Sequence, residues 1–117
     1  MDRVDQTPDG AVIVDYKSSD VRLQRKADEK ARDSLQLRVY ALAHERQTGA
    51  LPARMELHFL DTGLVGSVAP DPVRLQKARD EVAAAVEGVA GGQFPARPNP
   101  VACGYCPFRS LCPQSAA

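Results

Sequence analysis

The sequence predicts a small α/β domain, more specifically a mixed α+β arrangement in which a small mixed β-sheet is flanked by helices. A strong turn signal joins two segments of strand character within residues 1–17. Residues 54–60 alternate between apolar and polar side chains, and two further segments repeat apolar residues at helical spacing. The elements follow the order β-β-α-β-β-α, before a proline-rich arm and a cysteine cluster. A chain of 117 residues is enough for one small domain.

Residues 1–17 are expected to form a β-hairpin. The sequence TPDG at positions 7–10 places Pro at the second turn position and Gly at the last, where each is favoured. If the first and last residues of this turn pair, Asp2 lies opposite Asp15, with Cβ atoms roughly 4.5–5.5 Å apart. A one-residue bulge at Gly10 would instead move Asp2 to the other face.

The hairpin carries a candidate metal site. Asp15 and Lys17 are two residues apart, so both project from one face of a strand. Two opposed carboxylates repel each other unless a cation lies between them, so the pairing of Asp2 with Asp15 suits a divalent metal. The alternative is an ordinary exposed hairpin with scattered charges, and this segment alone leaves both readings open.

Residues 18–32 are polar and show little apolar periodicity, which predicts a loop or an exposed short helix. Basic and acidic residues interleave there, as on a solvated face. The basic residues are Arg22, Arg25, Lys26, Lys30 and Arg32, and the acidic ones nearby are Asp20, Asp28, Glu29 and Asp33.

The first clear helix is predicted to begin near Asp33 and to end at Gly49. Asp33 with Gln36 resembles a capping box, and glycine is a frequent helix stop. The expected buried stripe consists of Leu35, Val39 and Leu42. Gln36 and Tyr40 share another face of this helix. They could line a groove, but a surface glutamine beside a half-buried tyrosine is the commoner arrangement.

Residues 54–60 and 64–68 are predicted to be paired strands, with His58 on the polar face of the first. Pro70 and Pro72 open a second helix that ends at Gly91–Gly92. Its predicted apolar stripe is Leu75, Ala78, Val82, Val86 and Val89. Prolines then make the arm extended, which divides the chain into a core over residues 1–92 and an arm over residues 93–117.

Three cysteines lie close together in the arm. Cys103, Cys106 and Cys112 have the spacing C-x2-C-x5-C, which is typical of a metal site. An odd number of cysteines argues against a disulfide framework. A closed zinc site or an iron–sulfur cubane needs four ligands. His44 or His58 could complete the set, although both lie far away on other elements, and the other possibility is a fourth thiolate from outside this chain. A single C-x2-C pair with one further cysteine favours iron–sulfur over a zinc ribbon, and unliganded reduced thiols are the remaining alternative.

The overall composition is that of an ordinary globular chain. Charged residues make up 26% of it and the net charge is zero, so there is no basic excess of the kind that free-standing DNA-binding domains usually show. No apolar run is long enough to span a membrane, and no secretory signal is present. We therefore expect a cytoplasmic location.

Taken in order, these motifs resemble the PD-(D/E)XK nuclease superfamily, and most closely its RecB-like and AddB-like iron–sulfur branch. That branch carries an aspartate on one strand and Asp-Tyr-Lys on the next, matched here by Asp2 and by Asp15 to Lys17. A helix with Gln-x-x-x-Tyr follows, matched by Gln36 and Tyr40. The C-x2-C-x5-C spacing comes last, so the resemblance covers residues 2–113.

The resemblance implies a restriction-endonuclease-like core and a Mg²⁺- or Mn²⁺-dependent deoxyribonuclease. Asp2, Asp15 and the carbonyl of Tyr16 would bind the metal, and Lys17 would position the attacking water and stabilise charge at the phosphate. The helix residues Gln36 and Tyr40 would support the site and contact DNA. Cys103, Cys106 and Cys112 would hold three corners of a structural [4Fe–4S] cluster.

The same resemblance implies a DNA substrate and a helicase domain or subunit as partner, in double-strand break repair and recombination. A CRISPR-adaptation nuclease and a degenerate nuclease fold that serves as a DNA-binding scaffold are the alternatives. The family's first motif and its upstream cysteine have no counterpart before Asp2. We therefore expect a C-terminal fragment that alone is weakly active and assembles its cluster poorly, which robust Mg²⁺-dependent DNA degradation by the 117-residue chain would contradict.

Overall fold

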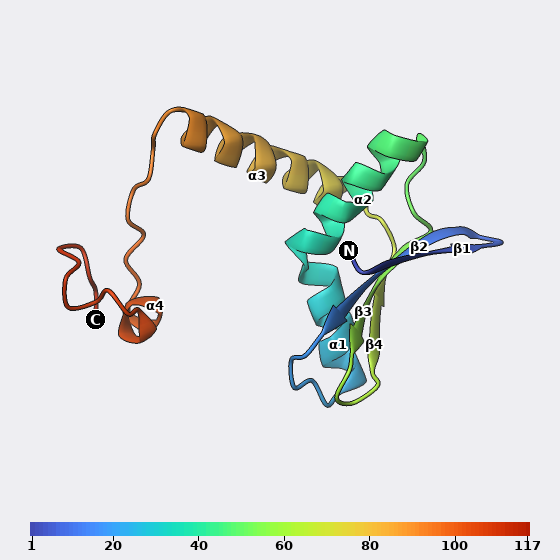
Figure 1. The fold of residues 1–117 in the computed structure, drawn as a ribbon, viewed down its shortest axis with the longest axis horizontal. Coiled ribbons are helices and arrows are strands. Elements are labelled where there is room, and N and C mark those ends of the chain that lie inside the picture. The colour runs from blue at the N-terminus through green and yellow to red at the C-terminus, as the bar shows by residue number, and fades with distance from the viewer. The chain divides into compact units, whose positions relative to one another are not determined.

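The computed structural model describes residues 1–117, which form two compact units, Met1–Ala83 and Ala84–Ala117. The chain contains four strands and four helices (Figure 1). In chain order they are β1 (Arg3–Thr7), β2 (Gly10–Lys17), α1 (Gln24–Asp33), α2 (Leu35–Thr48), β3 (Arg54–Phe59), β4 (Val65–Val68), α3 (Pro72–Ala90) and α4 (Pro100–Tyr105). This is the predicted mixed α+β class, and it is consistent with a restriction-endonuclease-like core.

The four strands form one mixed sheet in the order β1-β2-β3-β4. The β1–β2 and β3–β4 pairs are antiparallel, whereas β2 and β3 run parallel and are connected through α1 and α2. Thr7 pairs with Gly10 across the first turn, and the threonine hydroxyl donates to the Gly10 carbonyl at 2.7 Å. The predicted hairpin register is therefore confirmed, and the bulged alternative is wrong.

Helices α1 and α2 pack on one face of the sheet, α1 against β3 and β4 and α2 against β2 and β3 (Figure 1). The alternating strand β3 supplies its apolar side to this core, as its sequence predicted. The buried core cluster consists of Ile13, Val21, Ala27, Ala31, Leu37, Ala41, Met55, Leu57, Phe59 and Leu75. His58 lies on the opposite, polar side of β3, where Nε2 lies 3.0 Å from the Glu56 carboxylate.

The segment predicted as a loop or exposed short helix is a ten-residue helix, α1, that contributes to the core. Its buried residues are Ala27 and Ala31, four apart on one face, with the charged side chains on the rest of its surface. Alanines give a weak apolar signal, which is why the periodicity was not visible. Their burial depends on Gly66 of β4, because a Cβ atom there would lie 2.0 Å from the Ala27 carbonyl oxygen.

Helix α1 also satisfies backbone groups of β4, the edge strand of the sheet. The Gln24 amide donates to the Val65 carbonyl at 2.7 Å, and the Asp28 carboxylate accepts from the Ser67 N–H at 3.1 Å. Unpaired edge groups are a template for pairing with other chains. These two contacts therefore both orient α1 and protect this edge.

Two predictions about α2 are wrong in detail. Its N-cap is Ser34, whose hydroxyl oxygen accepts from the Leu37 N–H at 3.2 Å, and Asp33 is instead the last residue of α1. The buried residues are Leu37 and Ala41, whereas the predicted Leu35, Val39 and Leu42 are exposed or half-buried. Ser34 separates the two helices, so α2 starts at Leu35 with its own orientation. The buried face of α2 therefore differs from the one predicted for a helix that begins at Asp33. Gly49 ends the helix in the left-handed conformation, as predicted.

The predicted stripe of α3 is buried only in its first half. Leu75 and Ala78 are buried, but Val82, Val86 and Val89 are exposed. Residues 93–99 are without regular structure, and the six-residue helix α4, which was not predicted, begins at Pro100 with Asn99 as its N-cap. None of the helices combines the length and apolar character needed to cross a membrane.

Candidate active site at the end of strand β2

The hairpin places the two aspartates opposite each other at the end of the β1–β2 ladder. The Arg3–Val14 pair is the last regular one, and the Asp2 N–H then donates to the Val14 carbonyl at 3.1 Å, which continues the register to Asp2 and Asp15. Asp15 is only 5% exposed, and it is the sole buried charged residue of the chain. Burying a carboxylate is costly without compensation, so its partners matter.

Asp2 is held as a carboxylate by the backbone. Its Oδ2 accepts from the Tyr16 N–H at 2.7 Å, and this hydrogen bond is the main reason that the pKa of Asp2 lies below its ordinary value of 3.8. A side-chain hydrogen bond with Asp15 also lowers the pKa of Asp2, against the effect of burial. Asp2 is therefore ionised at neutral pH, as a metal ligand must be.

Four side chains from β2 and α2 form a continuous chain of polar contacts. The Lys17 ammonium lies 2.8 Å from the Asp15 carboxylate and donates to Gln36 Oε1 at 2.7 Å. The amide nitrogen of Gln36 in turn donates to the Tyr40 hydroxyl at 2.7 Å. The helical spacing of Gln36 and Tyr40 suggested an ordinary surface pair, but the fold brings this pair to Lys17.

Tyr16 presents its backbone to the site and its side chain to the other face. The phenol accepts from Arg3 at 2.8 Å, and its ring packs edge-on against His58 with 6.0 Å between centroids. Because Tyr16 lies beyond the last β1–β2 pair, its carbonyl points to the edge that β1 leaves open. The ring is thus excluded from the carboxylate site, whereas the carbonyl is available to it.

The donor set fits a hard divalent cation. Asp2, Asp15 and the Tyr16 carbonyl supply oxygen ligands only, and Mg²⁺ prefers oxygen and retains several water molecules when bound. No group of three or more His, Cys, Asp or Glu side chains comes together anywhere in the chain. A metal would therefore be held by two carboxylates and a backbone carbonyl, and not by a closed side-chain cage.

The same observation bears on the cysteines of the second unit. Cys103, Cys106 and Cys112 are half-buried free thiols that do not converge on one point, so this arrangement does not fit a cluster. The backbone N–H groups of Ala116 and then Asn99 lower the pKa of the Cys103 thiol, against the effect of burial. The thiolate of Cys103 is thereby favoured, but no common ligand site is formed.

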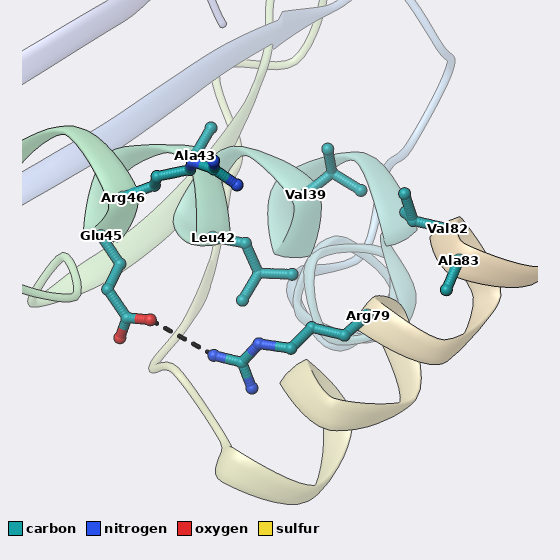
Figure 2. A pocket seen from close by; sticks show the side chains of 8 residues that line it. All are labelled: Val39, Leu42, Ala43, Glu45, Arg46, Arg79, Val82 and Ala83. Atoms are coloured by element: carbon teal, nitrogen blue, oxygen red, sulfur yellow. Dashed lines mark hydrogen bonds and ion pairs between the residues drawn. The ribbon is translucent and has the colours of Figure 1, made fainter. Parts of the chain in front are cut away.

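A groove of the first unit lies elsewhere. It has a volume of about 650 Å³ between α2 and α3 and is crossed by an ion pair of 3.2 Å between Glu45 and Arg79 (Figure 2). Its other lining residues are Val39, Leu42, Ala43, Arg46, Val82 and Ala83. None of the candidate site residues lines this groove. The candidate site is therefore identified by the chemistry of its side chains and not by a groove.

The family model of the PD-(D/E)XK nuclease superfamily matches residues 1–113. The chain therefore belongs to the PD-(D/E)XK nuclease superfamily. Membership implies a nuclease domain that cleaves phosphodiester bonds with DNA as substrate, and nucleases of this superfamily usually use divalent metals. No curated protein and no solved structure was found to match the chain.

Proposed function

We propose that this chain carries the metal-dependent catalytic centre of a deoxyribonuclease at the end of β2. The observation that carries the proposal is the chain of contacts from Asp15 through Lys17 and Gln36 to Tyr40, next to the carboxylate of Asp2. A buried carboxylate, an ammonium group and a second carboxylate on one face can hold a metal ion and stabilise the negative charge that develops in phosphodiester hydrolysis.

Each residue has a distinct proposed role. Asp2 and Asp15, with the Tyr16 carbonyl, hold Mg²⁺ or Mn²⁺, which when bound would lower the pKa of the attacking water and polarise a phosphoryl oxygen. Lys17 orients the water and places a positive charge where negative charge develops on the phosphate.

Gln36 acts as a positioning residue, and Tyr40 supports it. With Oε1 facing the Lys17 ammonium, the amide must turn its nitrogen to the Tyr40 hydroxyl, so the tyrosine fixes the orientation of the glutamine. This limits the positions that the lysine can adopt, because Asp15 holds it from the other side. Gln36 and Tyr40 are also exposed enough to contact the DNA strand.

The wider role that we propose is digestion of DNA, as an exonuclease or endonuclease, within a cytoplasmic helicase–nuclease of double-strand break repair and recombination. This finer assignment is supported by the RecB-like order of the motifs. A CRISPR-adaptation iron–sulfur nuclease is the alternative with the same motifs. The division into a core over residues 1–92 and an arm over residues 93–117 belongs to the same proposal.

For the arm, we propose that Cys103, Cys106 and Cys112 bind a [4Fe–4S] cluster when a fourth thiolate is supplied from outside this chain. The C-x2-C-x5-C spacing supports this, although the thiols must move together to do so. Protein prepared anaerobically with iron, sulfide and an added small thiol as the fourth ligand should be brown with visible absorption bands. Zinc binding without colour would overturn the iron assignment.

Metal binding tests the catalytic proposal independently of turnover. Isothermal titration of the 117-residue chain with Mn²⁺ should give one site, which Asp15→Asn abolishes or weakens at least tenfold. Asp5→Asn is the matched control, because Asp5 lies on the same hairpin and pairs with Arg3 at its surface. Equal Mn²⁺ affinity in the wild type and the Asp15 variant would refute the proposed site.

Cleavage of a labelled DNA strand in Mg²⁺ then separates an enzyme from a scaffold. Lys17→Ala should retain the metal site but lose at least a hundredfold in cleavage rate. An unchanged rate in this variant would favour the degenerate fold that only binds DNA.

A further inference from the structure

A second polar pocket adjoins the catalytic lysine. It has a volume of about 280 Å³, and its lining residues are Lys17, Ser19, Lys30, Ser34, Leu57 and Phe59. The pocket lies where β2 leaves the sheet and α1 meets α2, over the two buried side chains of β3. Its lining includes two ammonium groups and two hydroxyl groups, but no carboxylate.

The positive charge of this pocket is carried mainly by Lys30. Lys17 already lies 2.8 Å from the Asp15 carboxylate, which compensates its charge. In the same charged segment, Arg22 pairs with Asp20 and Lys26 pairs with Glu29. Lys30 takes part in no ion pair, and neither do Arg25 and Arg32, but of these three only Lys30 lines the pocket. The opposite charges predicted to interleave over residues 18–32 therefore do not all pair with each other. Lys30, which has no ion-pair partner, lines the pocket next to Lys17.

The two serines leave hydrogen-bond donors free. The Ser34 oxygen accepts from the Leu37 N–H, so its hydroxyl hydrogen remains available. The Ser19 hydroxyl takes part in no hydrogen bond, although its backbone carbonyl accepts from Val21. A compact group of lysine and hydroxyl donors without an acceptor of its own is the usual composition of a phosphate contact in nucleic-acid complexes.

We infer that this pocket binds a second phosphate group of the DNA strand whose scissile phosphate lies at Lys17. The inference rests on the proposed function and extends it, because it assigns Lys30, Ser19 and Ser34 a binding role beside the reacting phosphate. Lys17 borders both places, so one strand crossing the end of β2 reaches both. The ligand is either an internal phosphodiester or a terminal 5′-phosphate, which share the same chemistry.

The test is binding of a labelled single-stranded oligonucleotide, measured by fluorescence anisotropy in Ca²⁺ over a series of salt concentrations, with gels to show that the oligonucleotide stays intact. Loss of one single-strand phosphate contact lowers the slope of log affinity against log salt by about 0.7, or about fivefold in affinity at 0.1 M salt. Lys30→Ala should show this loss, and Ser19→Ala a smaller one. Lys77→Ala, which removes an exposed and unpaired lysine of α3, should show a smaller slope change than Lys30→Ala.

Oligonucleotides with a 5′-phosphate and a 5′-hydroxyl distinguish the two sources. An equal loss on both substrates assigns an internal phosphodiester, and a loss confined to the phosphorylated one assigns the terminal group. If Lys30→Ala binds like Lys77→Ala while the wild type binds well, the pocket assignment is overturned and the nuclease proposal stands. If the wild type binds no DNA at all, the proposed function itself fails.

Discussion

Gly66 of β4 is the residue on which the position of α1 depends most directly. A Cβ atom at this position would lie 2.0 Å from the carbonyl oxygen of Ala27 and 2.5 Å from its carbonyl carbon. Both are backbone atoms of α1, so no side-chain rotation relieves the clash. An ordinary contact begins near 3.4 Å, and α1 must therefore retreat from the sheet by roughly 1.4 Å in a Gly66→Ala variant.

The retreat has a cost that can be estimated from the contacts of α1. Overpacking of this kind costs about 1–3 kcal/mol. The movement also strains the hydrogen bonds from Gln24 to Val65 and from Ser67 to Asp28, each worth about 0.5–1.5 kcal/mol. Alanine recovers about 0.4–1 kcal/mol through the unfolded chain. We expect a net loss of about 2–4 kcal/mol in the free energy of unfolding.

Urea unfolding followed by far-ultraviolet circular dichroism measures this loss, as a lower midpoint with an unchanged slope. Gly88→Ala is the matched control, since a Cβ atom there meets nothing nearer than 3.8 Å and alanine favours the helix, by up to about 1 kcal/mol. If Gly66→Ala lies within about 0.5 kcal/mol of the wild type, the usual effect of a surface substitution, α1 is not held tightly against the backbone of β4. Because α1 also carries Lys30, a folded Gly66→Ala protein should bind DNA more weakly.

Three further substitutions test separate contacts. Gln36→Ala removes the group that holds Lys17 opposite Asp15, so the cleavage rate should fall about tenfold while the Mn²⁺ affinity stays unchanged. An unaltered cleavage rate would show that Gln36 has no role in catalysis. Ser34→Ala should cost about 1 kcal/mol in chemical denaturation because it deletes the N-cap of α2, and Asp33→Ala, the cap expected from sequence, should cost less. Glu56→Gln tests a pH dependence: burial raises the pKa of Glu56, but hydrogen bonds from Arg54 and His58 outweigh it and leave the pKa below 4.5. The carboxylate thus stabilises the fold above pH 4.5 and loses this effect as the pH falls through its lowered pKa. The wild type should therefore be more stable than the variant by up to about 1 kcal/mol at pH 7, and this difference should vanish in strong acid. Thermal melts of both proteins at several pH values measure it.

Most of the sheet could be predicted from sequence because its signals are local. The turn at residues 7–10 sets the register of β1 and β2, and the alternation along β3 identifies its buried side. Helix α1 could not be predicted in the same way. Its contribution to the core rests on two alanines and on a glycine about forty residues away, and only the folded chain brings these together.

Part of the candidate site could likewise be predicted from local sequence, and part depends on the folded chain. Asp2, Asp15 and Lys17 follow from hairpin register and strand alternation, which are short-range properties. The contact between Lys17 and Gln36 joins residues on different elements, and the spacing of Gln36 and Tyr40 on one helix gives no indication of it. That Lys30 has no ion-pair partner and lines the pocket beside Lys17 is likewise a property of the fold, because the sequence shows only an even mixture of charges in this segment.

The contact that stabilises buried Asp15 also involves Lys17, the lysine proposed to act in catalysis. A carboxylate that is 5% exposed is unfavourable in a core unless a cation accompanies it, and here Lys17 supplies that charge at 2.8 Å. Lys17 is itself shared with Gln36 and remains about one-third exposed, so it can turn toward an incoming phosphate without being extracted from the core. If it does so, Asp15 loses its compensating charge, and a divalent cation held with Asp2 restores it. Under the proposed function, binding of the metal and binding of the phosphate would therefore favour each other.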